Sequence, residues 1–142
     1  PLVYDELRKL ANTDYFDVML LHYQHVATWP KDTARWQDGV LEAKHKKALI
    51  GHGASVHGLP ALRQFPGNKW LEIAMIRMNH KGTRMDAEVY NTNEPGNVPE
   101  VVTHTKQVRK EGRGVISMKL VGEGAFPLRE SRIVRVLAHW PD

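Results

Sequence analysis

Histidine is the residue type in this sequence most suited to chemistry, and the 142 residues contain eight of them. Two pairs are close enough along the chain to be considered as metal ligands, His22 with His25 and His52 with His57. The first pair is three residues apart in a segment that we expect to be a strand, so its side chains would point to opposite faces. No carboxylate at ligand spacing accompanies the second pair. We therefore expect no metal site.

Other patterns that carry chemistry are absent or weak. The glycine-rich segment GHGASVHG, residues 51–58, lacks the GK[ST] ending of a phosphate-binding P-loop. The sequence has no cysteine, which excludes a disulfide framework, a thiolate zinc site and a cysteine nucleophile. Asp17 and Glu72 are the best candidates for acid–base work because each lies within an apolar segment, but an edge or solvent-facing position explains them more simply. We expect no catalytic residue, no cofactor and no small-molecule substrate.

Basic residues are unevenly distributed along the chain. Residues 1–43 hold four basic and seven acidic side chains, whereas residues 44–84 hold eight basic side chains and one acid. From residue 100 onward there are eight basic and five acidic side chains. This distribution, with a net charge of +4, is typical of a protein that contacts phosphate groups. A solvated basic surface explains the charge equally well.

Local patterns predict the elements that must position these residues. The spacing of apolar residues predicts a short helix over residues 2–12 and a helix from Asp32 or Thr33 to about Ile50. Residues 15–26 predict a buried strand, although so short an apolar run leaves a helix as an alternative. Basic residues in the last turns of the second helix are favoured by its dipole.

The second half of the chain predicts mainly strands. Residues 69–78 and 83–90 predict two strands that pair antiparallel through a hairpin turn at residues 79–82. A helix is expected over residues 99–111, and further strands over 115–121 and 132–140. This order predicts an α+β fold, an α/β sandwich with a mixed or antiparallel sheet. We expect one domain over 1–142, with a core at about 15–111, an N-terminal helix at 2–12 and a strand-rich extension at 114–142.

The longest apolar runs are far shorter than the ~20 residues that span a bilayer, so we expect no membrane partner.

The segment GASVHGLPALRQFPGNKWLEI, residues 53–73, resembles a family of thioredoxin-like mitochondrial domains. In ribosomal members of that family a Gly-Ala pair begins a helix, a Leu-Pro step and a spaced hydrophobic residue follow, and Asn-Pro precedes a strand. The corresponding residues here are Gly53-Ala54, Leu59-Pro60, Leu62, Asn68 and the strand that begins at Trp70. The sequence departs from the pattern at Ser55, His57 and Lys69. The resemblance favours the branch of the small-subunit protein twenty-five and implies a thioredoxin-like core.

The resemblance implies a structural component of the mitochondrial ribosome, located in the matrix, that binds ribosomal RNA and other ribosomal proteins and has no enzymatic activity. The residues expected to contact RNA are those of the basic centre and tail: Lys44, Lys46, Lys47, Arg63, Lys69, Lys81, Arg84, Arg109, Lys110 and Arg113. Two alternatives remain open. One is an accessory subunit of respiratory complex I, and the other is a small cone-shaped α+β enzyme that resembles the isomerases and dehydratases of the nuclear transport factor two group.

Overall fold

The computed structural model describes residues 3–82, 87–89, 94, 96–120 and 122 of the chain. Four strands form one sheet in the order β1-β2-β3-β4, and every neighbouring pair is parallel. The elements, in chain order, are α1 (Val3–Ala11), β1 (Phe16–Gln24), α2 (Trp29–Asp32), α3 (Ala34–His45), β2 (Leu49–Val56), α4 (Leu59–Leu62), β3 (Ile73–Arg77), α5 (Val98–Lys110) and β4 (Gly114–Met118). The helices return the chain between consecutive parallel strands, as βαβ connections require.

The described part of the chain is therefore an α/β fold with a parallel sheet, and the prediction of a mixed or antiparallel sheet was wrong. The expected hairpin is the source of the error. Strand β3 lies between β2 and β4 and is parallel to both, whereas the prediction gave it an antiparallel neighbour. The turn after β3 does form, with Gly82 N donating to the Asn79 carbonyl at 3.2 Å, and the next described element along the chain is helix α5. Parts of 83–90 and all of 132–140 lie outside the described residues.

Several predicted elements form near their expected places: the helices expected at 2–12 and 99–111 are α1 and α5, the strand expected at 15–26 is β1, and the strand expected at 115–121 is β4, which ends at Met118. The helix expected to run to Ile50 ends at His45 instead. Lys47 takes a left-handed backbone conformation with φ 60°, and Ala48 N donates to the Ala43 carbonyl at 3.0 Å, which closes the helix end. The residues that follow, Leu49–Val56, form strand β2 in the middle of the sheet.

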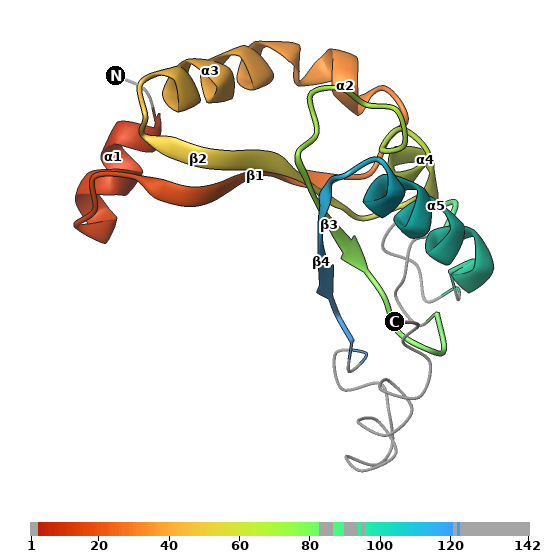
Figure 1. Ribbon diagram of the computed structural model, residues 1–142. Coiled ribbons are helices and arrows are strands. Elements are labelled where there is room, and N and C mark those ends of the chain that lie inside the picture. Colours follow the sequence, from red (N-terminus) through yellow and green to blue (C-terminus); the bar gives the residue numbers. More distant parts are fainter. Residues whose placement is uncertain (1–2, 83–86, 90–93, 95, 121, 123–142) are drawn as a thin grey trace.

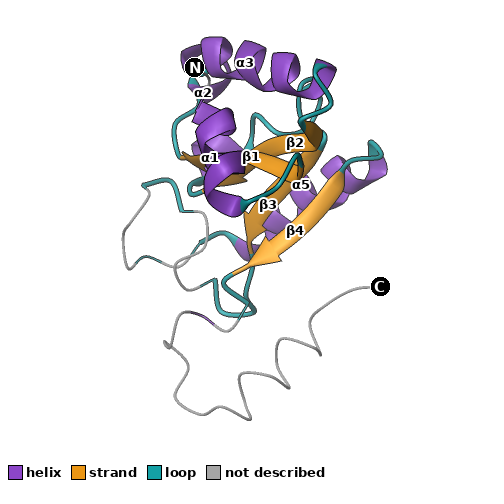
Figure 2. Ribbon diagram, turned by 90° about the vertical axis from the view of Figure 1, so that its left-hand side faces the viewer, coloured by secondary structure: helices purple, strands orange, loops and turns teal. Residues whose placement is uncertain are grey.

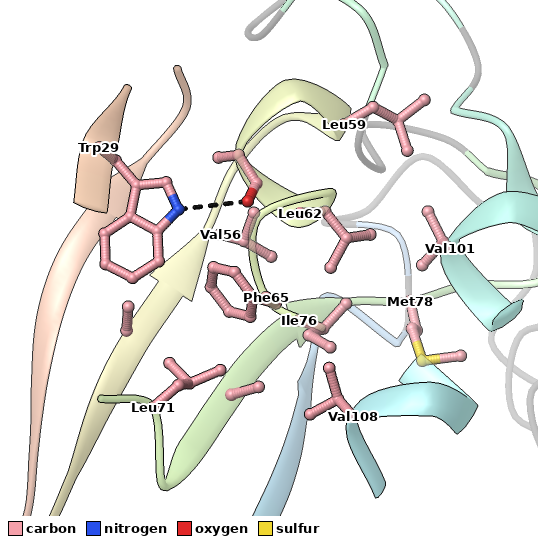
Figure 3. Close-up of a cluster of buried hydrophobic side chains, with 13 residues drawn as sticks. Trp29, Val56, Leu59, Leu62, Phe65, Leu71, Ile76, Met78, Val101 and Val108 are labelled. Atoms are coloured by element: carbon pink, nitrogen blue, oxygen red, sulfur yellow. Dashed lines mark hydrogen bonds between the residues drawn. The ribbon is translucent and has the colours of Figure 1, made fainter. Parts of the chain in front are cut away.

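One face of the sheet is covered by helices. The row Leu21, Ala54, Ala74 and Val115 runs across all four strands on this face, and all four residues belong to the main apolar core or pack against it. Figure 3 shows this core between the strands and helices α4 and α5. The core includes Trp29, Val56, Leu59, Leu62, Phe65, Leu71, Ile76, Met78, Val101 and Val108. The Trp29 indole N–H donates to the Ala61 carbonyl at 3.2 Å, which joins α2 to α4.

The other face carries the row Leu20, Gly53, Ile73 and Gly114, with Val18, Met75 and Ile116 in register beside it. We call this the open face, because helices α2 to α5 lie on the opposite side of the twisted sheet (Figure 1 and Figure 2). On it, Val18 and Ile116 remain 40% and 38% exposed. A sequential strand order with its helices on one side is the arrangement of a (β/α) barrel and differs from the doubly wound sheets that carry helices on both faces.

Candidate active site

In a parallel sheet the carboxyl ends of the strands meet at one edge, and in barrel and doubly wound folds this edge carries the active site. Here four polar side chains from three strands gather at that edge. The rings of His22 and His57 are perpendicular with their centroids 5.7 Å apart, and the Tyr23 ring lies 4.5 Å from that of His57. The Arg77 guanidinium is hydrogen-bonded to His57 Nδ1. We call His22, Tyr23, His57 and Arg77 the carboxyl-edge cluster.

An irregularity in β1 places the first two members of this cluster. The register between β1 and β2 shifts between Leu21 and Gln24, and Tyr23 has a positive φ of 69°. Tyr23 N donates to Ser55 Oγ at 2.9 Å, and His57 N donates to the Gln24 carbonyl at 2.7 Å, which holds the end of β1 against β2. A left-handed backbone at a non-glycine residue is destabilising by about 1 to 3 kcal/mol and concentrates at functional sites. The irregularity also turns His25 back, so that its ring lies 5.3 Å from that of Tyr23.

The hydrogen bond between Arg77 and His57 determines where the imidazole carries its proton. An arginine only donates hydrogen bonds, so Nδ1 of His57 must accept, and the proton of the neutral ring is on Nε2. His57 is 7% exposed. The cluster therefore combines a guanidinium, an imidazole N–H held in one tautomer, a second imidazole and a phenol. Such a set of donors suits the oxygen of a carbonyl group or of an anion.

A second polar group lies at the opposite edge, where the strands begin. His52, which is 3% exposed, places Nδ1 2.9 Å from Glu72 Oε2, and its ring lies 4.8 Å from that of Trp70. Lys44 forms an ion pair with the other oxygen of Glu72. Burial lowers the pKa of His52. Burial opposes ionisation of Glu72, but the hydrogen bond from Lys44 and the contacts with His52 together lower its pKa.

The predicted acid–base candidates therefore lie away from the carboxyl-edge cluster. Glu72 links α3 to β2 at the amino edge as an ion-paired group, and Asp17 is exposed near the start of β1. Sequence reasoning considered His22 and His57 only as metal ligands and did not single out Tyr23 or Arg77. The available signal was position, since each member of the cluster is a polar residue at the carboxyl end of an apolar strand.

The residues predicted to contact RNA are distributed over both edges and are partly engaged within the chain. Lys44 pairs with Glu72, Lys46 with Glu42, and Arg63 with both Glu88 and Glu100. Arg113 donates to the carbonyls of Asn68 and Leu71, each at 2.8 Å. Lys47 and Lys69, with Arg109 and Lys110 at the end of α5, lie exposed near the amino edge, Lys81 follows β3 at the carboxyl edge, and Arg84 lies outside the described residues. RNA binding by these residues stays a prediction.

Within the part of the chain that the structure describes, no group of three or more His, Cys, Asp or Glu side chains is arranged to hold a metal ion. None of the described helices is long and apolar enough to cross a membrane.

The comparisons with known proteins bear on the fold. No family model matches the sequence, and no curated protein matches it. Among solved structures, an aldo-keto reductase-like protein from Pseudomonas aeruginosa superimposes with a TM-score of 0.57 at 13% sequence identity. The match covers 84% of this chain and 40% of that chain, so the matched part spans less than half of the bacterial protein. At this identity the likeness shows a shared fold and nothing more.

Proposed function

We propose that this chain carries part of the active site of an enzyme that reduces the carbonyl group of an aldehyde or ketone. The observation that carries the proposal is the carboxyl-edge cluster, a set of hydrogen-bond donors at the edge where folds of this class place their catalytic groups. The name of the structural neighbour, an aldo-keto reductase-like protein, supports the choice of a carbonyl over other acceptor groups.

The cluster's chemistry matches the needs of that reaction. A hydride adds to the carbonyl carbon, the electron pair of the C=O π bond moves to oxygen, and the resulting alkoxide takes a proton. Arg77 and the Nε2–H of His57 would stabilise the negative charge that develops on oxygen, and the phenol of Tyr23 would supply the proton. These assignments make Tyr23, His57 and Arg77 the proposed catalytic residues, with the exposed His22 beside them.

The hydride must come from a reduced cofactor such as a nicotinamide dinucleotide. The glycines of residues 51–58 do not follow the G-x-G-x-x-G spacing of a pyrophosphate-binding turn, and Gly51 and Gly53 lie inside strand β2. The described residues therefore do not form that type of dinucleotide site, and we assign none of them to the hydride donor.

The test is a reductase assay with matched histidine variants. The purified protein would be given aromatic and aliphatic aldehydes with NADH or NADPH, and cofactor oxidation would be followed by absorbance. Removing an oxyanion donor typically lowers kcat by about 100- to 1000-fold, so His57→Ala should cause a loss of that order. Tyr23→Phe removes the proposed general acid and should lower kcat by about 100- to 10,000-fold. His45→Ala, at the exposed end of α3, is the control and should retain full activity. Absence of reduction with every aldehyde and both cofactors, or full activity in His57→Ala, would refute the proposal.

A further inference from the structure

The stagger of the strands supplies half of what a closed barrel needs. One row of paired residues runs across the sheet from Leu20 in β1 to Gly114 in β4. Leu20 is the fifth residue of β1, whereas Gly114 is the first residue of β4, so the start of the strand shifts by four residues from β1 to β4. A closed parallel barrel has about eight strands and a total displacement of about eight residues. The chain provides four strands and four residues of displacement. Two identical copies would complete both counts.

We propose that two copies of this chain close into one eight-stranded parallel barrel around a two-fold axis, with β4 of each copy paired in parallel with β1 of the other. The stagger determines the register: Gly114 lies opposite the partner's Phe16, and Ile116 lies opposite the partner's Val18. Closure pairs the outer edges of β1 and β4, which have no neighbour among the described strands. It also encloses the open face, as expected for a parallel sheet, which is normally covered on both sides.

The charges at the two outer edges are complementary. Near the start of β1 the acids Asp14 and Asp17 are exposed. Helix α1 carries two acids, Asp5 and Glu6, and two bases, Arg8 and Lys9, with Asp5 paired to Arg8, so the excess negative charge at this edge comes from Asp14 and Asp17. Near the start of β4 the end of α5 carries exposed Lys106, Arg109 and Lys110. The amino ends of neighbouring parallel strands lie side by side, so closure brings the acidic end of one copy to the basic end of the other, twice in the dimer.

Helix α1 provides a further apolar surface at the same edge. Leu7 and Leu10, one turn apart on this helix, are 41% and 85% exposed. In the closed dimer α1 would lie beside the partner's β4, on the helix-bearing side of the barrel. These leucines would then pack against the partner, as the helices of this chain pack against its own strands.

This inference goes beyond the proposed reaction and depends only on the fold. It also completes the candidate site, because closure places the carboxyl-edge cluster of each copy at the mouth of a barrel to which the partner contributes half the wall. The first test is the mass of the full chain in solution by light scattering. Twice the 16.2 kDa of the chain is expected. A monomer over the micromolar range would overturn the proposal and would indicate that the open face is covered by other residues of the same polypeptide.

The absence of cysteine permits a direct test of the register. Val18→Cys and Ile116→Cys are made separately, and each protein is oxidised to form disulfides, alone and after the two are mixed and allowed to exchange subunits. Neighbouring parallel strands lie about 4.8 Å apart, within the reach of a disulfide, whereas the partner's Val18 would lie on the opposite wall of the barrel. Only the mixture should therefore give a covalent dimer. Equal cross-linking of either variant alone, or none in the mixture, would contradict the register. Melting curves establish that both variants fold.

A charge exchange tests the edges independently. Arg109→Glu with Lys110→Glu should raise the dimer dissociation constant, and adding Asp14→Lys with Asp17→Lys should restore it. Failure of the second pair to restore association would contradict the proposed edge contact. The dimer and the reductase activity are measured separately, so a dimer without activity would refute only the proposed function, and an active monomer would refute only the barrel.

Discussion

Replacing Gly53 by alanine provides a severe test of the sheet. Gly53 lies in β2 opposite Ile73 of β3. A Cβ atom added to it would lie 1.7 Å from the Ile73 carbonyl oxygen, 2.6 Å from the carbonyl carbon and 3.1 Å from Cα. All three atoms belong to the backbone, so no side-chain rotation relieves the overlap. Strands β2 and β3 must separate for the alanine to fit.

The expected loss of stability follows from that separation. A carbon atom approaches a carbonyl oxygen to about 3.3 Å, so the strands would have to move apart locally by roughly 1.5 Å. The three residue pairs of the β2–β3 ladder, Gly53 with Ile73, Ala54 with Ala74 and Ser55 with Met75, all lie within this region. At about 1 kcal/mol for each hydrogen bond, together with the usual 1 to 3 kcal/mol of overpacking, Gly53→Ala should lower the free energy of unfolding by roughly 3 to 5 kcal/mol. That is a large part of the 5 to 15 kcal/mol typical of a domain.

The assay is urea unfolding followed by tryptophan fluorescence, because Trp29 is buried in the core. Gly39→Ala is the control, since a Cβ at this helical glycine in α3 meets nothing within 4 Å. Alanine is the better helix former, so this variant should gain about 0.5 to 1 kcal/mol. The same glycine-to-alanine change should thus lower the free energy of unfolding at position 53 and raise it at position 39. A Gly53→Ala protein within about 1 kcal/mol of the parent, with an unchanged urea slope, would refute the described β2–β3 contact.

Four further predictions concern other parts of the chain. Burial lowers the pKa of His52 below its usual 6.5 in the folded protein, so the unfolded chain takes up the proton first and the free energy of unfolding should fall as the pH drops below 6.5. The His52→Gln variant should lose this pH dependence, and a variant with the parent's pH–stability profile would contradict the role of His52. The lowered pKa of Glu72 acts in a separate window, since its stabilising effect is present above its ordinary pKa of 4.5 and is lost as the pH falls through its lower folded value; Glu72→Gln should therefore flatten the profile below pH 4.5. Trp29→Phe removes the indole donor to the Ala61 carbonyl and leaves a small void, so thermal melts should show a loss of about 2 to 3 kcal/mol, whereas a loss below about 0.5 kcal/mol would show that this bond contributes nothing. If the chain binds RNA as its charge predicts, changing Lys44, Lys46 and Lys47 to Glu should flatten the log–log salt dependence of binding by about 2 units, and Glu72→Gln controls for loss of the ion pair to Lys44.

Local sequence patterns were sufficient for the elements whose determinants lie within the segment itself. Strand β1 was predicted from a run of apolar residues with a boundary at each end. Helix α5 begins at Val98 and is capped by Asn97, whose side chain accepts a hydrogen bond from Glu100 N; this cap and Pro99 in the first turn are both local signals. The end of α3 was misplaced because Ala48 and Leu49 continue the helical spacing. Only the left-handed Lys47 and the contact of Leu49 with β1 show that a strand begins there.

What the sequence by itself determined was therefore the existence of most helices and strands, because capping and apolar spacing act over a few residues. Which strands are neighbours, and in which direction they run, was decided only by the tertiary structure, because alternation looks the same in a parallel and an antiparallel strand. The parallel order of β1, β2 and β3 brings His22, His57 and Arg77 to one edge, although 35 and 20 residues separate them in turn along the chain. Strand β2, with two glycines, has little intrinsic strand propensity and forms because neighbouring strands approach closely on both sides.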